Sequence, residues 1–120
     1  MYKVLLVDDE YMITEGLKRL IPFEKWDMEV VATANHADEA LDYVREHPVD
    51  VVISDVNMPD KTGLEMIGEM KELLPDAYYI LLSGYQEFDY VKQAMNLNVV
   101  DYLVKPVDKV ELEHLLEKIL

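Results

Sequence analysis

An α/β fold, with five parallel strands in one sheet and helices on both of its faces, is predicted by three features of this 120-residue sequence. Short apolar runs alternate with helix-like stretches five times along the chain. Runs such as VLLV and VVI are apolar throughout, which is typical of strands buried on both sides. Prolines and capping residues fall between these stretches, and parallel strands joined through helices account for all three features.

Five segments are predicted to be strands, because they are short, apolar and separated by polar or helical stretches. In chain order they are Lys3–Val7, Glu29–Ala34, Val49–Ser54, Tyr78–Leu82 and Val99–Val104. Each is followed by a stretch with an apolar stripe at helical spacing. The stripes are Ile13, Gly16, Leu17, Leu20; Ala37, Ala40, Leu41, Val44; Leu64, Ile67, Met70, Leu74; Phe88, Val91, Ala94, Met95; and Leu112, Leu115, Leu116, Ile119.

Local signals agree with these helix starts. Thr62 with Glu65, and Asp108 with Glu111, each place an oxygen-bearing cap three residues before a glutamate. Prolines lie between the predicted elements at positions 22, 48, 75 and 106. We therefore expect one domain that spans residues 1–120.

The composition limits the functions open to this domain. No apolar run approaches the length of a membrane helix and no signal-like segment opens the chain, so a cytoplasmic protein without membrane contact is expected. Eleven basic against 25 acidic residues give a formal charge of −14, which argues against direct binding of nucleic acid. The absence of cysteine and the three scattered histidines make a zinc site unexpected.

Three aspartates follow two of the predicted strands: Asp8 and Asp9 follow the first, and Asp55 follows the third. In a five-stranded sheet of flavodoxin-like order 2-1-3-4-5, ligands bind between the ends of these two strands. An acidic pair after a strand can also be a solvated turn. Three carboxylates in one crevice, however, repel one another unless a cation is present, and a hard ion such as Mg²⁺ suits them.

Two other strand ends add polar groups to the same edge of the sheet. Ser83 follows the fourth strand and Lys105 follows the fifth. Taken alone, a serine before a glycine is turn chemistry and a lone lysine is a surface residue. Around Asp55, however, a hydroxyl, an ammonium group and a metal could hold the equatorial oxygens of a phosphoryl group. Asp55 is therefore predicted to be a nucleophile toward phosphorus.

Four stretches in consistent order resemble the receiver domain of two-component response regulators: VLLVDDE, VVISDVNMPDKTGLE, LLSGY and DYLVKPV. The resemblance covers essentially the whole chain and implies a doubly wound, flavodoxin-like (βα)5 fold with strand order 2-1-3-4-5. It implies a signalling phosphoacceptor that takes a phosphoryl group from a sensor histidine kinase. Such a domain catalyses only its own phosphotransfer and slow dephosphorylation.

The resemblance also implies roles for the residues of the acidic crevice. Asp55 corresponds to the phosphoacceptor. Asp9 corresponds to a direct Mg²⁺ ligand, with Asp8 acting through water. Asp55 itself also belongs to the implied metal set, and the backbone carbonyl of Asn57 completes the metal shell. Ser83 would contact a phosphoryl oxygen. Lys105 would neutralise the phosphoryl charge, and its bond to the following proline is expected to be cis.

Two tyrosines have implied roles in signalling. Tyr102 stands at the position of a switch aromatic, which would rotate inward when Ser83 moves toward the phosphoryl group. It could equally be a half-buried tyrosine of an edge strand. The switch would alter the face formed by the fourth helix, fifth strand and fifth helix, through which family members commonly dimerise. Tyr85, with Asn57, would set the lifetime of the phosphoryl group, although Tyr85 could simply pack on the loop surface.

Two further stretches, SGYQEFDYVKQAM and IPFEKWDMEVVATA, resemble receivers attached to AraC-type helix-turn-helix output domains. This likeness implies that the full-length protein regulates transcription through a C-terminal DNA-binding domain that is absent from this chain. His36 stands where the family often has glycine, and it is expected to be a solvated loop residue.

Three other readings compete. A phosphohydrolase of the haloacid dehalogenase kind has its nucleophile first and its acidic pair last, the reverse of the order here, and also needs room for a cap. A flavin-binding flavodoxin needs a phosphate loop after the first strand, where Asp8, Asp9 and Glu10 would repel phosphate. A degenerate receiver that binds partners without phosphorylation stays open, although every chemical position is filled.

Overall fold

The computed structural model describes residues 1–84 and 96–119. Within these residues one sheet contains five parallel strands in the order β2-β1-β3-β4-β5. The strands are β1 (Tyr2–Val7), β2 (Met28–Ala34), β3 (Val51–Asp55), β4 (Tyr78–Ser83) and β5 (Asp101–Val104). The predicted fold class and strand order are confirmed.

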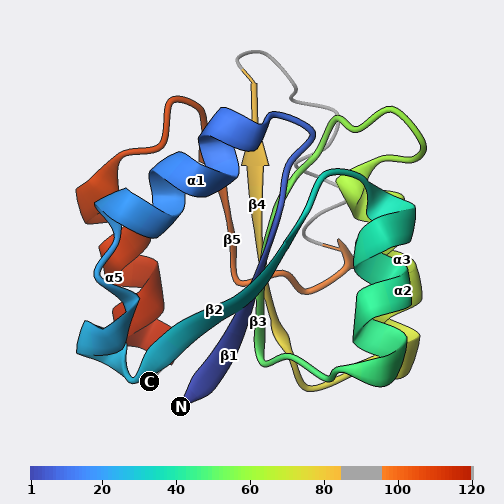
Figure 1. Ribbon diagram of the computed structural model, residues 1–120, viewed down its shortest axis with the longest axis horizontal. Coiled ribbons are helices and arrows are strands. Elements are labelled where there is room, and N and C mark those ends of the chain that lie inside the picture. The colour runs from blue at the N-terminus through green and yellow to red at the C-terminus, as the bar shows by residue number, and fades with distance from the viewer. Residues whose placement is uncertain (85–95, 120) are drawn as a thin grey trace.

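Helices cover both faces of the sheet, with α1 and α5 on one side and α2 and α3 on the other (Figure 1). The described helices are α1 (Tyr11–Leu20), α2 (Ala37–Glu46), α3 (Gly63–Leu73) and α5 (Lys109–Ile119), with a 3₁₀ turn at Phe23–Trp26. The stripe predicted around Phe88, Val91, Ala94 and Met95 lies outside the described residues. This two-sided cover explains why the central strands are apolar throughout.

The core has two halves because successive side chains of a strand point to opposite faces. On the side of α2 and α3 it includes Leu5, Val7, Val52 and Leu81, with the stripe of α2. On the side of α1 and α5 it includes Val4, Leu6, Ile53 and Leu82, with the stripe of α5. The strands are therefore packed on both faces as far as the residues next to Asp8 and Asp55.

The predicted stripe of the first helix is partly wrong. Leu17 is buried, but Gly16 and Leu20 are exposed. Ile21, which follows the helix, is buried instead, because the chain turns there toward the sheet and enters the 3₁₀ turn that buries Trp26. The fifth strand also begins at Asp101 rather than Val99.

Capping signals were correct at both predicted helix starts. The Thr62 hydroxyl accepts from the Glu65 N–H at 3.1 Å, and the Glu65 carboxylate accepts from the Thr62 N–H at 3.2 Å. The Asp108 carboxylate accepts from the N–H groups of Val110 and Glu111. The bond between Lys105 and Pro106 is cis, as expected.

Candidate functional site

Asp8 and Asp55 lie at the ends of the two central strands. Val7, the last residue of β1, pairs with Ser54 of β3, so the next residue of each strand reaches the same edge of the sheet. Hydrogen bonds to β2 and β4 continue the pairing past that edge: the Asp8 N–H donates to Ala34 O at 3.0 Å, and the Val56 N–H donates to Leu82 O at 3.0 Å. Both carboxylates are therefore buried, with Asp8 1% and Asp55 5% exposed.

Lys105 joins these two carboxylates. Its Nζ lies 2.8 Å from Asp8 Oδ2 and 3.3 Å from Asp55 Oδ2. The lysine is held at this edge by its own backbone, because its N–H donates to Ser83 O at 2.7 Å across the end of β4. Residues far apart in the sequence thus meet at one point, as the order of the strands predicted.

The environment of Asp55 raises the pKa of its carboxyl group. Burial and the neighbouring charge of Asp8 raise the pKa of Asp55 from 3.8 to about 6, against the opposing effect of Lys105 and of the Asn57 N–H, which hydrogen bonds the carboxylate. Burial acts to lower the pKa of Lys105, but its bond to Asp8 and the charges of Asp55 and Asp8 outweigh burial and raise it. Lys105 is therefore a cation, and Asp55 is mostly ionised at neutral pH and above.

A group of carboxylates able to hold a metal lies beside this pair. Oxygens of Asp8, Asp9 and Glu10 all lie within 4.8 Å of one another, and the Glu10 N–H donates to Asp8 Oδ1 at 2.9 Å. A donor set made only of carboxylate oxygens fits a hard cation such as Mg²⁺. Glu10 was not among the predicted ligands, although the acidic run from Asp8 to Glu10 was a signal that could have identified it.

Asn57 stands on the exposed loop that follows β3, with its N–H hydrogen bonded to the Asp55 carboxylate. The loop closes on itself at its far end, where the Gly63 N–H donates to Val56 O at 2.7 Å. Gly63 lies so close to the strand that an added Cβ would stand 2.2 Å from Asp55 O. This close approach requires glycine at position 63, which no sequence pattern predicted.

Ser83 and Tyr102 contact each other directly. The buried Ser83 hydroxyl donates to the hydroxyl of Tyr102 on the neighbouring strand β5. Tyr102 is half-buried and packs against the core on the side of α2 and α3. The two predicted switch residues are therefore paired through their side chains, whereas Tyr85 lies outside the described residues.

His36 is exposed, as expected for a loop residue, but it also caps a helix. Its Nδ1 accepts from the Glu39 N–H at 3.2 Å at the start of α2. At the position where family members often have glycine, His36 therefore acts as the N-cap of α2 through its side chain.

Comparisons with known proteins agree with this geometry. Residues 4–117 match the family model described as the response regulator receiver domain. The transcriptional regulatory protein HptR of Staphylococcus aureus is 39% identical over 119 residues, which cover 99% of this chain and 46% of that protein. This chain thus spans about half the length of the curated relative.

Two solved structures are similar over nearly their whole length. The receiver domain of AraT, a response regulator of Geobacillus stearothermophilus, is 41% identical, has a TM-score of 0.92 and is matched over 98% of this chain and 92% of its own. A two-component transcriptional regulator AraC from Clostridium phytofermentans is 29% identical, has a TM-score of 0.91 and is matched over 99% and 92%. No helix among the described residues is both long and apolar enough to cross a bilayer.

Proposed function

The chain belongs to the family of response regulator receiver domains of two-component signalling, and from that membership we propose that Asp55 accepts a phosphoryl group from a phosphohistidine of a sensor histidine kinase. The observation that carries this proposal is the contact of Lys105 with both Asp8 and Asp55. It places a cation beside a buried carboxylate at an edge of the sheet that also carries Asp9 and Glu10.

In the proposed step one oxygen of Asp55 attacks phosphorus. The new O–P bond forms as the P–N bond breaks, and the electron pair of that bond stays on the imidazole nitrogen, which then takes a proton from solvent. The reactive form of Asp55 is the ionised one, because a protonated carboxyl is a poor nucleophile. A pKa of about 6 leaves most of the Asp55 population ionised at neutral pH.

The residues around Asp55 would bind the metal ion and the phosphoryl oxygens. Asp8, Asp9, Asp55 and the Asn57 carbonyl, with Glu10 beside them, would hold Mg²⁺, which when bound supplies positive charge to the phosphoryl oxygens. Lys105 would transfer its contact from Asp8 to a phosphoryl oxygen, since the lysine already lies beside Asp55. The Ser83 hydroxyl would donate to another phosphoryl oxygen.

The pairing of Ser83 with Tyr102 supports a mechanical link from the site to the surface. If Ser83 donates to a phosphoryl oxygen, it gives up its bond to the Tyr102 hydroxyl. Tyr102 then loses this hydrogen bond on its half-buried side, which would favour a second rotamer of its ring. Phosphorylation would thus favour one of two arrangements of β5 and the adjoining surface.

An apolar cleft next to Lys105 supports docking of the kinase. It has a volume of about 320 Å³ and runs from α1 to the segment after β5, where Met12, Ile13, Leu17, Pro106 and Val107 line it. Met12 is 78% exposed at its rim. A helical domain seated on this cleft would bring a phosphohistidine toward Asp55, because Lys105 belongs to both the cleft and the acidic site.

The output is proposed from the relatives. HptR is named a transcriptional regulatory protein and is about twice as long as the matched region, so a DNA-binding domain, of the AraC type in our proposal, would follow this receiver in the full-length protein. The formal charge of −14 makes the receiver itself unsuited to DNA.

Intact-mass measurement after incubation with acetyl phosphate and Mg²⁺ tests the proposal. Wild type is expected to gain one phosphoryl group, and Asp55→Asn none. Asp50→Asn is the matched control, because Asp50 precedes the opposite end of β3 and its carboxylate accepts from Lys3 N–H at 2.8 Å. Retained phosphorylation in Asp55→Asn, or none in wild type, would overturn the assignment.

A further inference from the structure

The loop between β3 and α3 is fixed at both ends but extends between them. Val56 is bonded to β4 and to Gly63, and Thr62 is fixed by its capping box. Asn57 lies between these anchors, on the exposed part of the loop. Whatever holds the outer part of the loop therefore also sets where the backbone of Asn57 points.

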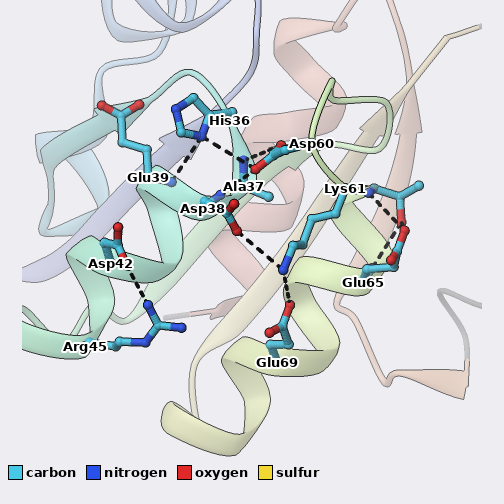
Figure 2. Close-up of polar contacts among 11 residues, drawn as sticks. His36, Ala37, Asp38, Glu39, Asp42, Arg45, Asp60, Lys61, Glu65 and Glu69 are labelled. Atoms are coloured by element: carbon cyan, nitrogen blue, oxygen red, sulfur yellow. Dashed lines mark hydrogen bonds and ion pairs between the residues drawn. The ribbon is translucent and has the colours of Figure 1, made fainter.

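Asp60 makes that outer contact. Its Oδ1 accepts from the Ala37 N–H at 3.1 Å and its Oδ2 from the Asp38 N–H at 2.8 Å. Ala37 and Asp38 are the first two residues of α2, so the carboxylate of one loop caps a helix that follows another loop (Figure 2). The free N–H groups at a helix start, with the helix dipole, favour a negative charge at this position.

The other N–H groups of this helix start have partners of their own. The Glu39 N–H donates to His36 Nδ1 and the Ala40 N–H donates to His36 O. The Asp60 carboxylate thus fills the two places that the local sequence leaves open. The contact of Asp60 with α2 therefore consists of two hydrogen bonds to particular N–H groups, and not only of attraction to the helix dipole.

The pKa of Asp60 and the ion pairs of its neighbour Lys61 both indicate that the Asp60 carboxylate is ionised and held in place. Burial acts to raise its pKa, but backbone N–H groups outweigh burial and lower the pKa to about 2: those of Asp38 and Ala37 contribute most, followed by those of Asp60 and Lys61 in its own loop. Lys61 strengthens the same link, because its Nζ lies 3.4 Å from Asp38 on α2 and 2.7 Å from Glu69 on α3 (Figure 2). His36 Nδ1 lies 3.6 Å from Asp60 Oδ2 at the edge of the group.

We infer that Asp60 is a positioning residue for the phosphoacceptor site: by capping α2 it holds the loop in which Asn57 presents its N–H to Asp55 and its carbonyl to the metal. The part that concerns the metal rests on the proposed function. In this role Asp60 would touch neither the phosphoryl group nor the cation and would act through the backbone of the loop.

The test compares Asp60→Ala and Asp60→Asn with Asp50→Ala. Asp50 is the matched control, since its carboxylate also accepts from a backbone N–H, at the far edge of the sheet. Two quantities are measured: amide hydrogen exchange of Asn57 without metal, and the dissociation constant for Mg²⁺ by calorimetry. The first measurement does not depend on the proposed function.

Asp60→Ala is expected to exchange its Asn57 amide faster than wild type and to bind Mg²⁺ about ten-fold more weakly, the scale on which partners of metal ligands act. Asp60→Asn keeps one acceptor oxygen and should fall between the two, while Asp50→Ala should match wild type in both measurements. If Asp60→Ala loses only thermal stability, with exchange at Asn57 and Mg²⁺ affinity unchanged, Asp60 is a helix cap alone and the inference is wrong. Absence of Mg²⁺ binding in wild type would reject the proposed metal site, and the exchange rates would still decide the role of Asp60.

Discussion

Asp55 is a destabilising residue in the metal-free protein at neutral pH. Its pKa is about 6 in the folded protein, against an ordinary value of 3.8, so the folded state binds its proton more tightly than the unfolded state does. Between about pH 4 and pH 6 the folded state carries more protons, and stability therefore falls as the pH rises through this window. This loss of stability arises because the ionised Asp55 carboxylate is buried beside the negative charge of Asp8.

Asp55→Asn is expected to stabilise the metal-free protein, because the amide cannot ionise. The gain should be close to zero below about pH 4, grow through about pH 6 and level off at about 3 kcal/mol, because the folded and unfolded pKa values differ by about two, at about 1.4 kcal/mol each. Urea unfolding of both proteins in EDTA at pH 4 and pH 8 measures this difference. If Asp55→Asn is no more stable than wild type at pH 8, the ionised Asp55 carboxylate does not destabilise the folded protein.

The pairing of Ser83 with Tyr102 leads to a second prediction at the same scale. A double-mutant cycle with Ser83→Ala and Tyr102→Phe should give a coupling of about 1 kcal/mol in the resting protein, the usual size for one hydrogen bond between neutral groups. With beryllofluoride and Mg²⁺ the coupling should disappear, since Ser83 then donates to the phosphoryl mimic. Equal coupling in both states would contradict the switch.

Asn57 and Tyr102 were assigned through the resemblance to receivers, whereas the site residues predictable from the sequence pattern itself are those that end a strand. Asp8, Asp55 and Lys105 belong to that class, and the structure brings them together. Asp60 was not predictable, because its partners lie more than twenty positions earlier at the start of a different helix and no local pattern marks such a contact.

At the scale of elements, α3 contains two glycines, and replacing each by alanine is expected to change the stability of the protein in opposite directions. Gly63, the first residue of the helix, packs against the backbone of Asp55, whereas an added Cβ at Gly68 meets nothing within 4 Å. The first position needs glycine for a close approach. The second is an ordinary helix interior, where glycine is less stable than alanine.

Gly63→Ala should therefore destabilise the protein by about 1–3 kcal/mol, as overpacking does. Because the clash is with the carbonyl of Asp55, the variant should also be phosphorylated more slowly by acetyl phosphate. Gly68→Ala, the matched control, should gain about 0.5–1 kcal/mol and keep the wild-type rate. Thermal unfolding and intact-mass time courses measure both quantities, and equal behaviour of the two variants would contradict this account of the helix start.

Most elements were predictable because the stripes of α2 and α5 and both capping signals depend on neighbouring residues in sequence. Their exact ends were not. Leu20 continues the pattern of α1 yet is exposed, since burial there depends on how the chain turns at Ile21 toward the 3₁₀ turn. Such a turn is decided by tertiary packing.

For the whole molecule, the alternation of strands and helices predicted a parallel sheet, but it did not by itself choose among strand orders. The order with β1 between β2 and β3 came from the resemblance to receivers, and the structure has it. This order is what carries Asp8 and Asp55 to adjacent positions, so the site follows from the topology.

Phosphorylation is expected to promote a dimer. Sedimentation velocity at micromolar concentration should show a monomer in the resting protein and a dimer with beryllofluoride and Mg²⁺, because the altered surface around β5 would pair with its copy. Asp55→Asn should stay monomeric under both conditions. An unchanged profile in wild type would argue against dimerisation as the output.

The crystal structure of the wild-type complex with beryllofluoride and Mg²⁺ is the most direct test of the phosphoacceptor site. We expect beryllium bonded to an oxygen of Asp55, Mg²⁺ among the oxygens of the acidic run that begins at Asp8, and the ammonium of Lys105 on a fluorine. An unmodified Asp55, or a cation bound elsewhere while the acidic run stays empty, would contradict the central claim.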